Sequence, residues 1–422
     1  MRVTICAYDA PNNIDGPTAW MKRLLPYLRN NGVEVRIIYF AANHKDLAAY
    51  NHFTKLGFEC KVIYWELFYE EKVMAILNDI KNYPPDIFIP NYFPFAFCAA
   101  KWIKQSGIPT VMVLHNDNSF HHALIKEYAA KNYEDDVSVI VGVSKLITGI
   151  IYELTTRHDN IYCIPCGAPV SQQIANNPSG KEFNLVYAGR IVEPQKRISE
   201  VTRAFCRVAK EIPGTNCTIY GSGRAEPEMK KILNTEGKGL SVKYGGKLES
   251  GLVQQYLLQN HIFVLLSDFE GIPISLMEAM GCGLVPVCLN IRSGIAELIE
   301  NGKTGILVDD RQDAFVNAIK TLKNNAAQWQ SLSIAAREKI VTEYSEETCN
   351  RSWLNLLKKL HAETNQKKSL EIPLMEELKK QIVIRKEFSE YLMLTPPALL
   401  IPLYKIKFFL GRLKRRLLRQ VY

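Results

Sequence analysis

The sequence predicts an α/β protein built from two similar halves, each a doubly wound parallel sheet covered by helices on both faces. Two observations support this prediction. Short apolar runs alternate with segments of helical length, and a polar stretch near the middle of the chain interrupts the alternation before it starts again. In addition, 422 residues are too many for one ordinary core and fit two or three domains of roughly 150 residues each.

The first half contains six apolar runs, rich in β-branched residues, that are expected to be strands. They lie at 3–7, 35–40, 61–65, 87–90, 110–115 and 137–143. A helix is expected from Pro17 to Asn30, after the loop that follows the first strand. Near-continuous apolar strands separated by helices are typical of a parallel sheet that is buried on both faces.

A polar stretch at 169–182 contains Pro, Gly, Asn and Ser without apolar periodicity, and we interpret it as a domain linker. Six further strands are expected after it, at 184–188, 217–220, 242–244, 262–267, 284–289 and 305–308. The predicted organisation is an N-terminal domain, a linker, a C-terminal domain, C-terminal helices and a tail, at 1–168, 169–182, 183–345, 346–394 and 395–422. No short repeat period is visible, so the two halves are similar in architecture only.

The composition is close to that of an average soluble globular protein, with 47% hydrophobic, 10% aromatic and 23% charged residues. It argues against a wholly disordered chain and against a multi-span membrane protein. The ten cysteines lie mostly in apolar runs, which is typical of small buried residues in a reducing compartment. The C-x-x-C at Cys163 and Cys166 lacks a second ligand pair, so we assign it a structural role and expect no metal there.

Positive charge is concentrated at the C-terminal end of the sequence. The net charge is +9, and residues 391–422 contain seven basic and no acidic side chains. The nearly neutral remainder argues against nucleic acid as a partner. Helical periodicity from Leu403 to Val421 separates apolar from basic residues, which predicts that 399–422 bind an anionic membrane surface. The alternative is a helix that packs back on the protein with its basic face in solvent.

The ends of the sequence also lead to an expected location. The chain enters a strand at Val3 without the pattern of a signal peptide. Near the other end, Pro396, Pro397 and Lys405 interrupt the run of roughly 20 apolar residues that a spanning helix needs. We therefore expect a cytoplasmic protein that is peripheral on the inner face of the membrane.

In open α/β sheets, ligands bind beyond the carboxyl ends of the strands, where helix N-termini present unpaired N–H groups. The run at 262–283 places Glu270 and Gly271 directly after a buried strand. Pro273 suits the first turn of the next helix, which carries Glu278. Two such carboxylates can accept hydrogen bonds from sugar or ribose hydroxyls, while the N–H groups between them face a diphosphate. The alternative is a solvated Glu270 and a packed Glu278.

Three other strand ends carry candidate residues. Arg190 follows a strand and Lys196 precedes the next helix, which suits neutralisation of a departing nucleoside diphosphate, although an ordinary surface pair has the same pattern. Gly221 opens a G-x-G without the third glycine of a dinucleotide fingerprint, which argues against NAD or FAD. His115 ends a strand, where a structural and a ligand-binding role are both open.

Together these motifs resemble those of retaining glycosyltransferases of family 4, which have the GT-B architecture of two facing Rossmann-like domains. The resemblance covers about residues 1–360 and is strongest in the E-x7-E motif formed by Glu270 and Glu278. The remaining motifs stand in the family's order: Gly189-Arg190 with Lys196, Gly221-Ser222-Gly223, Gly245-Gly246-Lys247-Leu248, 141–144, 164–168, 293–299 and 301–308. One departure is the first loop, which has only Gly16 where two adjacent glycines are common.

The resemblance implies that a nucleotide-sugar donor binds the C-terminal domain and the acceptor the N-terminal domain. The implied donor-binding residues are Gly16, Arg190, Lys196, Gly221, Lys247, Leu248, Glu270, Gly271, Ile272, Pro273, Ile274 and Glu278. Arg190 and Lys196 would hold the diphosphate, and Glu278 the ribose. Glu270 would contact the transferred sugar, and His115 would reach it from the other domain. His115, Glu270, Arg190 and Lys196 are therefore the implied catalytic residues.

The reaction implied by the resemblance is transfer of a hexose from a UDP- or GDP-sugar to a glycan or lipid-linked acceptor, with retention of anomeric configuration. Cations and helix N–H groups would stabilise the leaving diphosphate as its charge develops. No Asp-x-Asp occurs in the chain, so we expect no metal and no other cofactor. Two alternatives stay open: a GT-B sugar-nucleotide epimerase and a non-catalytic, glycosyltransferase-like binding subunit.

Overall fold

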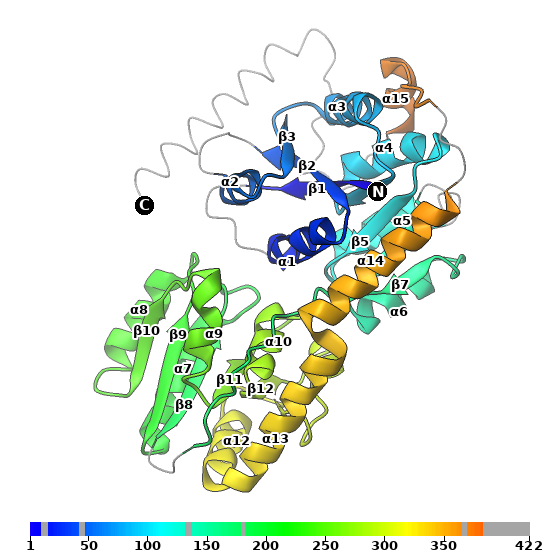
Figure 1. The fold of residues 1–422 in the computed structure, drawn as a ribbon. Helices are drawn as coiled ribbons and strands as arrows, with labels where there is room; N and C mark the ends of the chain where they lie inside the picture. Colours follow the sequence, from blue (N-terminus) through cyan, green and yellow to red (C-terminus); the bar gives the residue numbers. More distant parts are fainter. Residues whose placement is uncertain (10–15, 42–46, 131–136, 179–181, 365–368, 383–422) are drawn as a thin grey trace.

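The computed structural model describes residues 1–9, 16–41, 47–130, 137–178, 182–364 and 369–382, and shows two α/β halves joined by two crossings of the chain (Figure 1). Each half contains one sheet in which every strand pair is parallel. The predicted fold class is therefore confirmed. The predicted tail at 395–422 lies outside the described residues.

The first sheet has seven strands in the order β3-β2-β1-β4-β5-β6-β7. Its strands are β1 (Arg2–Tyr8), β2 (Glu34–Ala41), β3 (Glu59–Tyr64), β4 (Ile87–Asn91), β5 (Thr110–Leu114), β6 (Val139–Gly142) and β7 (Ile161–Cys163). Its helices are α1 (Gly16–Asn30), α2 (Ala48–Lys55), α3 (Tyr69–Asn82), α4 (Pro94–Gln105), α5 (Ser119–Tyr128) and α6 (Lys145–Leu154). The six predicted strands and the predicted first helix are confirmed, whereas β7 was not predicted.

The second sheet has six strands in the order β10-β9-β8-β11-β12-β13. Its strands are β8 (Phe183–Ala188), β9 (Thr215–Tyr220), β10 (Val242–Gly246), β11 (Ile262–Leu265), β12 (Val285–Leu289) and β13 (Ile306–Val308), all at predicted positions. Its α-helices are α7 (Ile198–Glu211), α8 (Glu226–Thr235), α9 (Val253–Leu257), α10 (Ile274–Gly281), α11 (Ile295–Leu298), α12 (Asp313–Asn324) and α13 (Ala326–Lys339). A 3₁₀ turn, η2 (Ser250–Leu252), precedes α9, and a π-helical turn, η3 (Ile340–Tyr344), follows α13.

The central strands form because their side chains are apolar on both faces. All residues of β4, β5, β11 and β12 are buried, and helices cover both sides of each sheet. Helix starts are set by capping side chains: Asn118 accepts from the N–H of His121 at α5, and Ser144 accepts from the N–H of Ile147 at α6. Because all strands of a sheet are parallel, their carboxyl ends lie at the same edge of that sheet.

The chain returns to the first half after the second sheet is complete. At the crossing, the Ala168 N–H donates to the Tyr344 carbonyl at 2.9 Å, and the Glu346 N–H donates to the Ala168 carbonyl at 2.8 Å. Helix α14 (Glu346–Glu363) then packs against α1, where fully buried Trp353 and Trp20 have ring centroids 5.3 Å apart (Figure 1). The segment expected as C-terminal helices thus covers part of the first half, while the domain boundaries themselves stay predictions.

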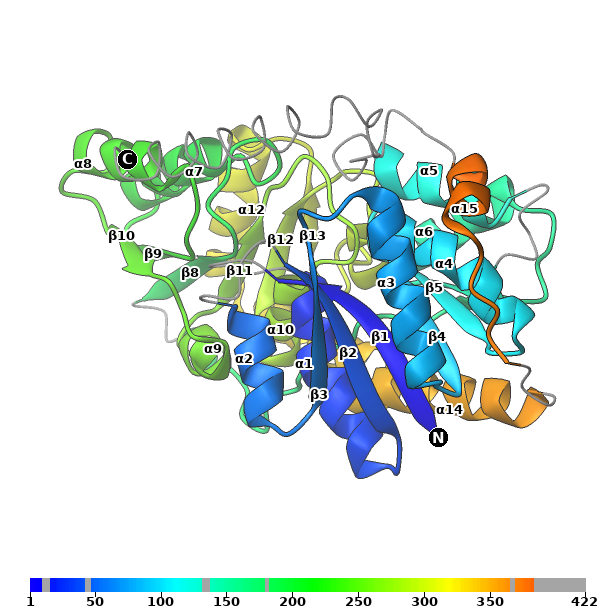
Figure 2. The ribbon, with the colours of Figure 1, turned by 90° about the horizontal axis from the view of Figure 1, so that it is seen from above.

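Helix α15 (Met375–Gln381) lies beside α3 on the first half (Figure 2). Leu378 is fully buried among the apolar residues of α3 and α4, and Lys379 Nζ lies 3.9 Å from a carboxylate oxygen of Glu70 at the start of α3. The described chain therefore ends, at Ile382, close to the carboxyl edge of the first sheet. Within the described residues, no helix is both long enough and apolar enough to cross a membrane.

Candidate active site between the two sheets

The carboxyl edges of the two sheets face each other, and two close approaches join them. Gly16, at the start of α1, lies so near α10 that a Cβ placed on it would be 3.6 Å from Ile274 Cδ1. Gly271, in the loop between β11 and α10, lies against the first half: a Cβ there would be 2.9 Å from the carbonyl oxygen of His115. The predicted residues of both halves therefore meet at one place.

The centre of the second half's contribution is a buried ion pair between Lys196 Nζ and Glu270 Oε1, each residue only 7% exposed. Gln195 Nε2 donates to Glu270 Oε2 at 3.2 Å and to the Phe269 carbonyl at 3.0 Å. An exposed Arg190 donates in turn to Gln195 Oε1 at 2.5 Å. Arg190, Lys196 and Glu270 were predicted together and are brought together, whereas Gln195, which links them, was not among the predicted site residues.

His115, directly after β5, is the first half's predicted residue. Its Nε2 lies 2.9 Å from Asn91 Oδ1, and because Asn91 Nδ2 donates to the Cys6 carbonyl at 3.2 Å, the amide oxygen accepts the imidazole proton. The ring also meets Trp20 edge-on, with centroids 5.3 Å apart. Burial, with a smaller contribution from His121, lowers the pKa of His115 to about 3, so the imidazole is neutral at pH 7.

Glu278 lies about one turn into α10, and its ion-pair partner is Arg23 of α1, with 3.6 Å between carboxylate and guanidinium. Arg23 also donates to the Gly167 carbonyl at 3.2 Å. Burial raises the pKa of Glu278, while Arg23 opposes the rise. The ion pair between Glu278 and Arg23 therefore joins the two halves. The expected contact of Glu278 with a ribose stays a prediction.

The remaining predicted donor residues line the same edge. Ile272 and Pro273 are buried, Pro273 stands at the N-cap of α10, and Ile274 is the first residue of that helix. Lys247 is exposed and Leu248 half-buried, directly after β10. Gly221 has φ +141°, and a Cβ on it would overlap the Gly189 carbonyl oxygen, so only glycine allows these two loops to approach.

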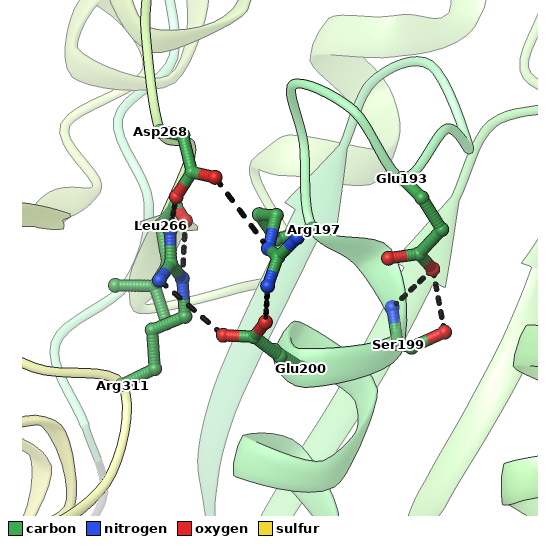
Figure 3. Close-up of polar contacts among 7 residues, drawn as sticks. All are labelled: Glu193, Arg197, Ser199, Glu200, Leu266, Asp268 and Arg311. Carbon is green, nitrogen blue, oxygen red and sulfur yellow. Dashed lines mark hydrogen bonds and ion pairs between the residues drawn. The ribbon is translucent and has the colours of Figure 1, made fainter.

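A network of four charged side chains holds the loops that carry Lys196 and Glu270 (Figure 3). Arg311 Nε donates to the Leu266 carbonyl at 2.8 Å, and its guanidinium pairs with Asp268 and with Glu200, the latter at 3.3 Å. Arg197 pairs with the same two carboxylates from the start of α7, where it adopts a left-handed φ of 50°. The loop before α7 is thereby fixed to the loop after β11.

Sequence reasoning missed the network and the partner of Glu278. A signal existed for Arg311, because it follows β13 and so lies at the carboxyl edge that the other strand ends had already identified. No local signal marks Arg23, which lies inside an amphipathic helix and meets Glu278 only through the packing of the two halves. Within the described residues, no group of three or more histidine, cysteine or acidic side chains is arranged to hold a metal ion.

Two facing parallel sheets, with polar side chains gathered between their carboxyl edges, define the GT-B class of fold. Comparison with family models identifies the two halves separately. Residues 14–172 match the model described as Glycosyltransferase Family 4, and residues 171–339 match Glycosyl transferases group 1. The chain therefore belongs to the group 1, family 4 glycosyltransferases.

Several curated proteins are similar to parts of the chain. The amylovoran biosynthesis glycosyltransferase AmsK of Erwinia amylovora is 33% identical over 198 residues, which are 43% of this chain and 48% of that protein. The putative colanic acid biosynthesis glycosyltransferase WcaL of Salmonella typhimurium is 24% identical over 288 residues, 64% of this chain and 70% of that protein. For AmsK, the match spans only about half of the relative, and for the GtfA subunit of a Streptococcus pneumoniae N-acetylglucosaminyltransferase only 32%.

Solved structures share the fold over most of the chain. The Anabaena protein Alr3699/HepE, crystallised in complex with UDP, has a TM-score of 0.68 at 16% identity, and the match covers 85% of this chain and all of that one. The sucrose-phosphate synthase of Thermosynechococcus elongatus has a TM-score of 0.67 at 16% identity, covering 86% and 99%. These likenesses support the two-domain architecture.

Removal of Arg311 should weaken the folded state more than its place on the surface suggests. An Arg311→Ala change leaves the Leu266 carbonyl without its donor and leaves Asp268 and Glu200 with Arg197 as their remaining partner, so we expect a loss of about 1–3 kcal/mol in the free energy of unfolding, measured by urea denaturation. Arg207→Ala is the matched control, because exposed Arg207 pairs with Glu211 and Asp313 and should cost at most about 0.5 kcal/mol. Equal losses in the two variants would contradict the role of the network.

The low pKa of His115 should make stability depend on pH. Unfolded histidine binds a proton near pH 6.5, whereas folded His115 stays neutral down to about pH 3, so the unfolded state binds more protons and stability falls as the pH is lowered. Between pH 7.5 and pH 5, wild-type protein should lose about 2 kcal/mol more unfolding free energy than His115→Gln. Parallel pH profiles for the two proteins would show that His115 is protonated in the folded state.

Proposed function

We propose that the protein is a retaining glycosyltransferase that transfers a hexose-type sugar from a UDP- or GDP-sugar to a glycan or lipid-linked acceptor. The observation that carries the proposal is the buried Lys196–Glu270 pair at the carboxyl edge of the second sheet, in a loop that touches His115 of the first. Two relatives named for amylovoran and colanic acid biosynthesis support a glycan acceptor. A structural neighbour crystallised with UDP and glucose supports a nucleotide-sugar donor.

One set of groups at the proposed site would contact the leaving diphosphate, and another would contact the transferred sugar. Lys196 has three N–H donors, so it can keep its contact with Glu270 while it donates to a diphosphate oxygen. Exposed Arg190 adds a second cation, and the N–H groups of Ile274 and Ser275, at the start of α10, would add dipoles directed at the same oxygens. These groups interact more strongly with the departing diphosphate than with the intact donor, which lowers the barrier to bond cleavage.

The transferred sugar would lie between Glu270 and His115. Glu270 is held by two donors, so its orientation is fixed before a sugar arrives. Arg190 and Lys196 supply the positive charge for the diphosphate, so we propose metal-independent transfer, in keeping with the lack of an Asp-x-Asp sequence. The acceptor hydroxyl attacks on the face from which the diphosphate leaves, which retains the anomeric configuration.

Two other functions make different predictions. A sugar-nucleotide epimerase of the same fold would change its donor in the absence of any acceptor. A binding subunit without activity would not need the hydrogen-bonded set formed by Arg190, Gln195, Lys196 and Glu270, and the presence of this set therefore favours an enzyme.

Nucleotide binding is the first test of the proposed donor site. In a thermal-shift screen of UDP, GDP, ADP and their sugars, one base should stabilise the wild-type protein, by about 2.7 kcal/mol at a hundredfold excess over Kd, with and without EDTA. Arg190→Ala, Lys196→Ala and Glu278→Ala should reduce the shift. Arg203→Ala is the control, since this exposed arginine pairs with Glu236 on the outer surface. Absence of a shift with every nucleotide would favour the binding subunit.

We further propose that residues 399–422 bind an anionic membrane, which would place a lipid-linked acceptor near the site. The proposal rests on the periodic separation of basic and apolar residues in the sequence. It is supported by the course of the chain, which reaches Ile382 beside the start of α3, at the carboxyl edge that faces the second half. The protein would then work at the cytoplasmic face of the membrane.

Vesicle co-sedimentation tests the membrane segment. The full chain should bind vesicles that contain phosphatidylglycerol, with an affinity that falls as salt rises, because each basic residue near the surface contributes about 1 kcal/mol. Vesicles of phosphatidylcholine alone are the control. A chain truncated before Leu399 should lose the binding while keeping its thermal unfolding. Unchanged binding after truncation would exclude this segment as the membrane contact.

A further inference from the structure

A carboxylate of the second half caps a helix of the first. Glu297, in the short helix α11, extends across the boundary to the start of α6. Its Oε2 accepts the backbone N–H of Lys145 and its Oε1 accepts that of Leu146, both at 2.8 Å. The pairing is therefore bidentate and made entirely to main-chain groups of the other half.

This contact completes the start of α6. The next two N–H groups of the helix already have partners, because Ile147 donates to Ser144 Oγ at 3.1 Å and Thr148 donates to the Ser144 carbonyl at 2.9 Å. Only the first two N–H groups depend on Glu297. A negative charge at a helix N-terminus also interacts favourably with the helix dipole, so the contact is directional and charge-assisted.

Both ends of the contact are connected to the candidate site by backbone hydrogen bonds. On the second half, the Gly294 N–H donates to the Gly271 carbonyl at 3.0 Å, and a Cβ on Gly294 would overlap that oxygen. On the first half, the Val143 N–H donates to the Leu114 carbonyl at 3.2 Å, directly before His115. Gly271 itself lies against His115. The Glu297 cap and the candidate site are therefore connected through both halves by a continuous series of contacts.

We propose that Glu297 is a positioning residue that fixes the separation between the Glu270–Gly271 loop and His115. The inference rests on the proposed function, in that transfer requires the two loops to enclose one sugar. Nucleotide binding should not require it, since all the residues implied to bind the donor except Gly16 belong to the second half. Loss of the cap should therefore affect turnover while leaving nucleotide affinity in place.

The two partners of the cap can each be removed separately. Glu297→Ala removes the acceptor. Lys145→Pro removes one donor N–H while keeping the helix, because proline is favoured at the first helical position and Ser144 already has the extended backbone that precedes proline. Glu300→Gln is the matched control, since the exposed carboxylate of Glu300 pairs with Lys303 of its own loop.

Enzyme kinetics and small-angle X-ray scattering on the full chain test the positioning role of Glu297. We expect Glu297→Ala and Lys145→Pro each to lower kcat by about three- to thirtyfold, the double variant to be no worse than Glu297→Ala, and Kd for the nucleotide to change less than twofold. The radius of gyration from small-angle X-ray scattering should rise in both variants and stay unchanged in Glu300→Gln.

Two results would overturn the proposal: losses that multiply in the double variant, or a nucleotide affinity that falls in parallel with kcat. A wild-type protein that transfers no sugar would instead refute the proposed function. In that case the scattering data still test the positioning role of Glu297. An increase in the radius of gyration confined to Glu297→Ala and Lys145→Pro supports that role, and an unchanged radius overturns it.

Discussion

The second half is organised around the need to pair two buried charges. Transferring an ammonium and a carboxylate out of water costs several kcal/mol each, so Lys196 and Glu270 are tolerable only in contact. They come from different loops, which must therefore keep a fixed relation. Gln195 occupies the second oxygen of Glu270, and Arg311 and Arg197 join the flanking Asp268 and Glu200 (Figure 3). This network thus fixes the geometry of the buried pair.

A second constraint acts between the halves. The two crossings of the chain are hydrogen-bonded to each other at Ala168, so the halves share one point at which their relative position is set. Arg23 with Glu278, and Glu297 with the start of α6, add polar contacts at other points of the boundary. The last two contacts use charged side chains and the Ala168 contact uses main-chain groups, so directional polar interactions set the boundary at all three points.

The strands were predictable because nearly every residue of the central ones is buried, and an apolar run of five or six residues has few other uses in a soluble chain. Strand β7 was missed since it has three residues, of which only Ile161 is buried. The positions of Lys196, Glu270 and His115 followed from strand ends alone. Arg23 and Glu297 did not, because their partners lie in the other half and no periodicity within the sequence encodes that pairing.

Helix α14 has a further consequence for how the chain is made. The first sheet is complete by Cys163, yet part of the α1 face that carries Trp20 is covered by Trp353, which follows the entire second half. During synthesis from the N-terminus, the first half therefore emerges with an aromatic surface still open to water and to chaperones. The second half is therefore synthesised before α14 is available, so the last long helix completes the earliest domain.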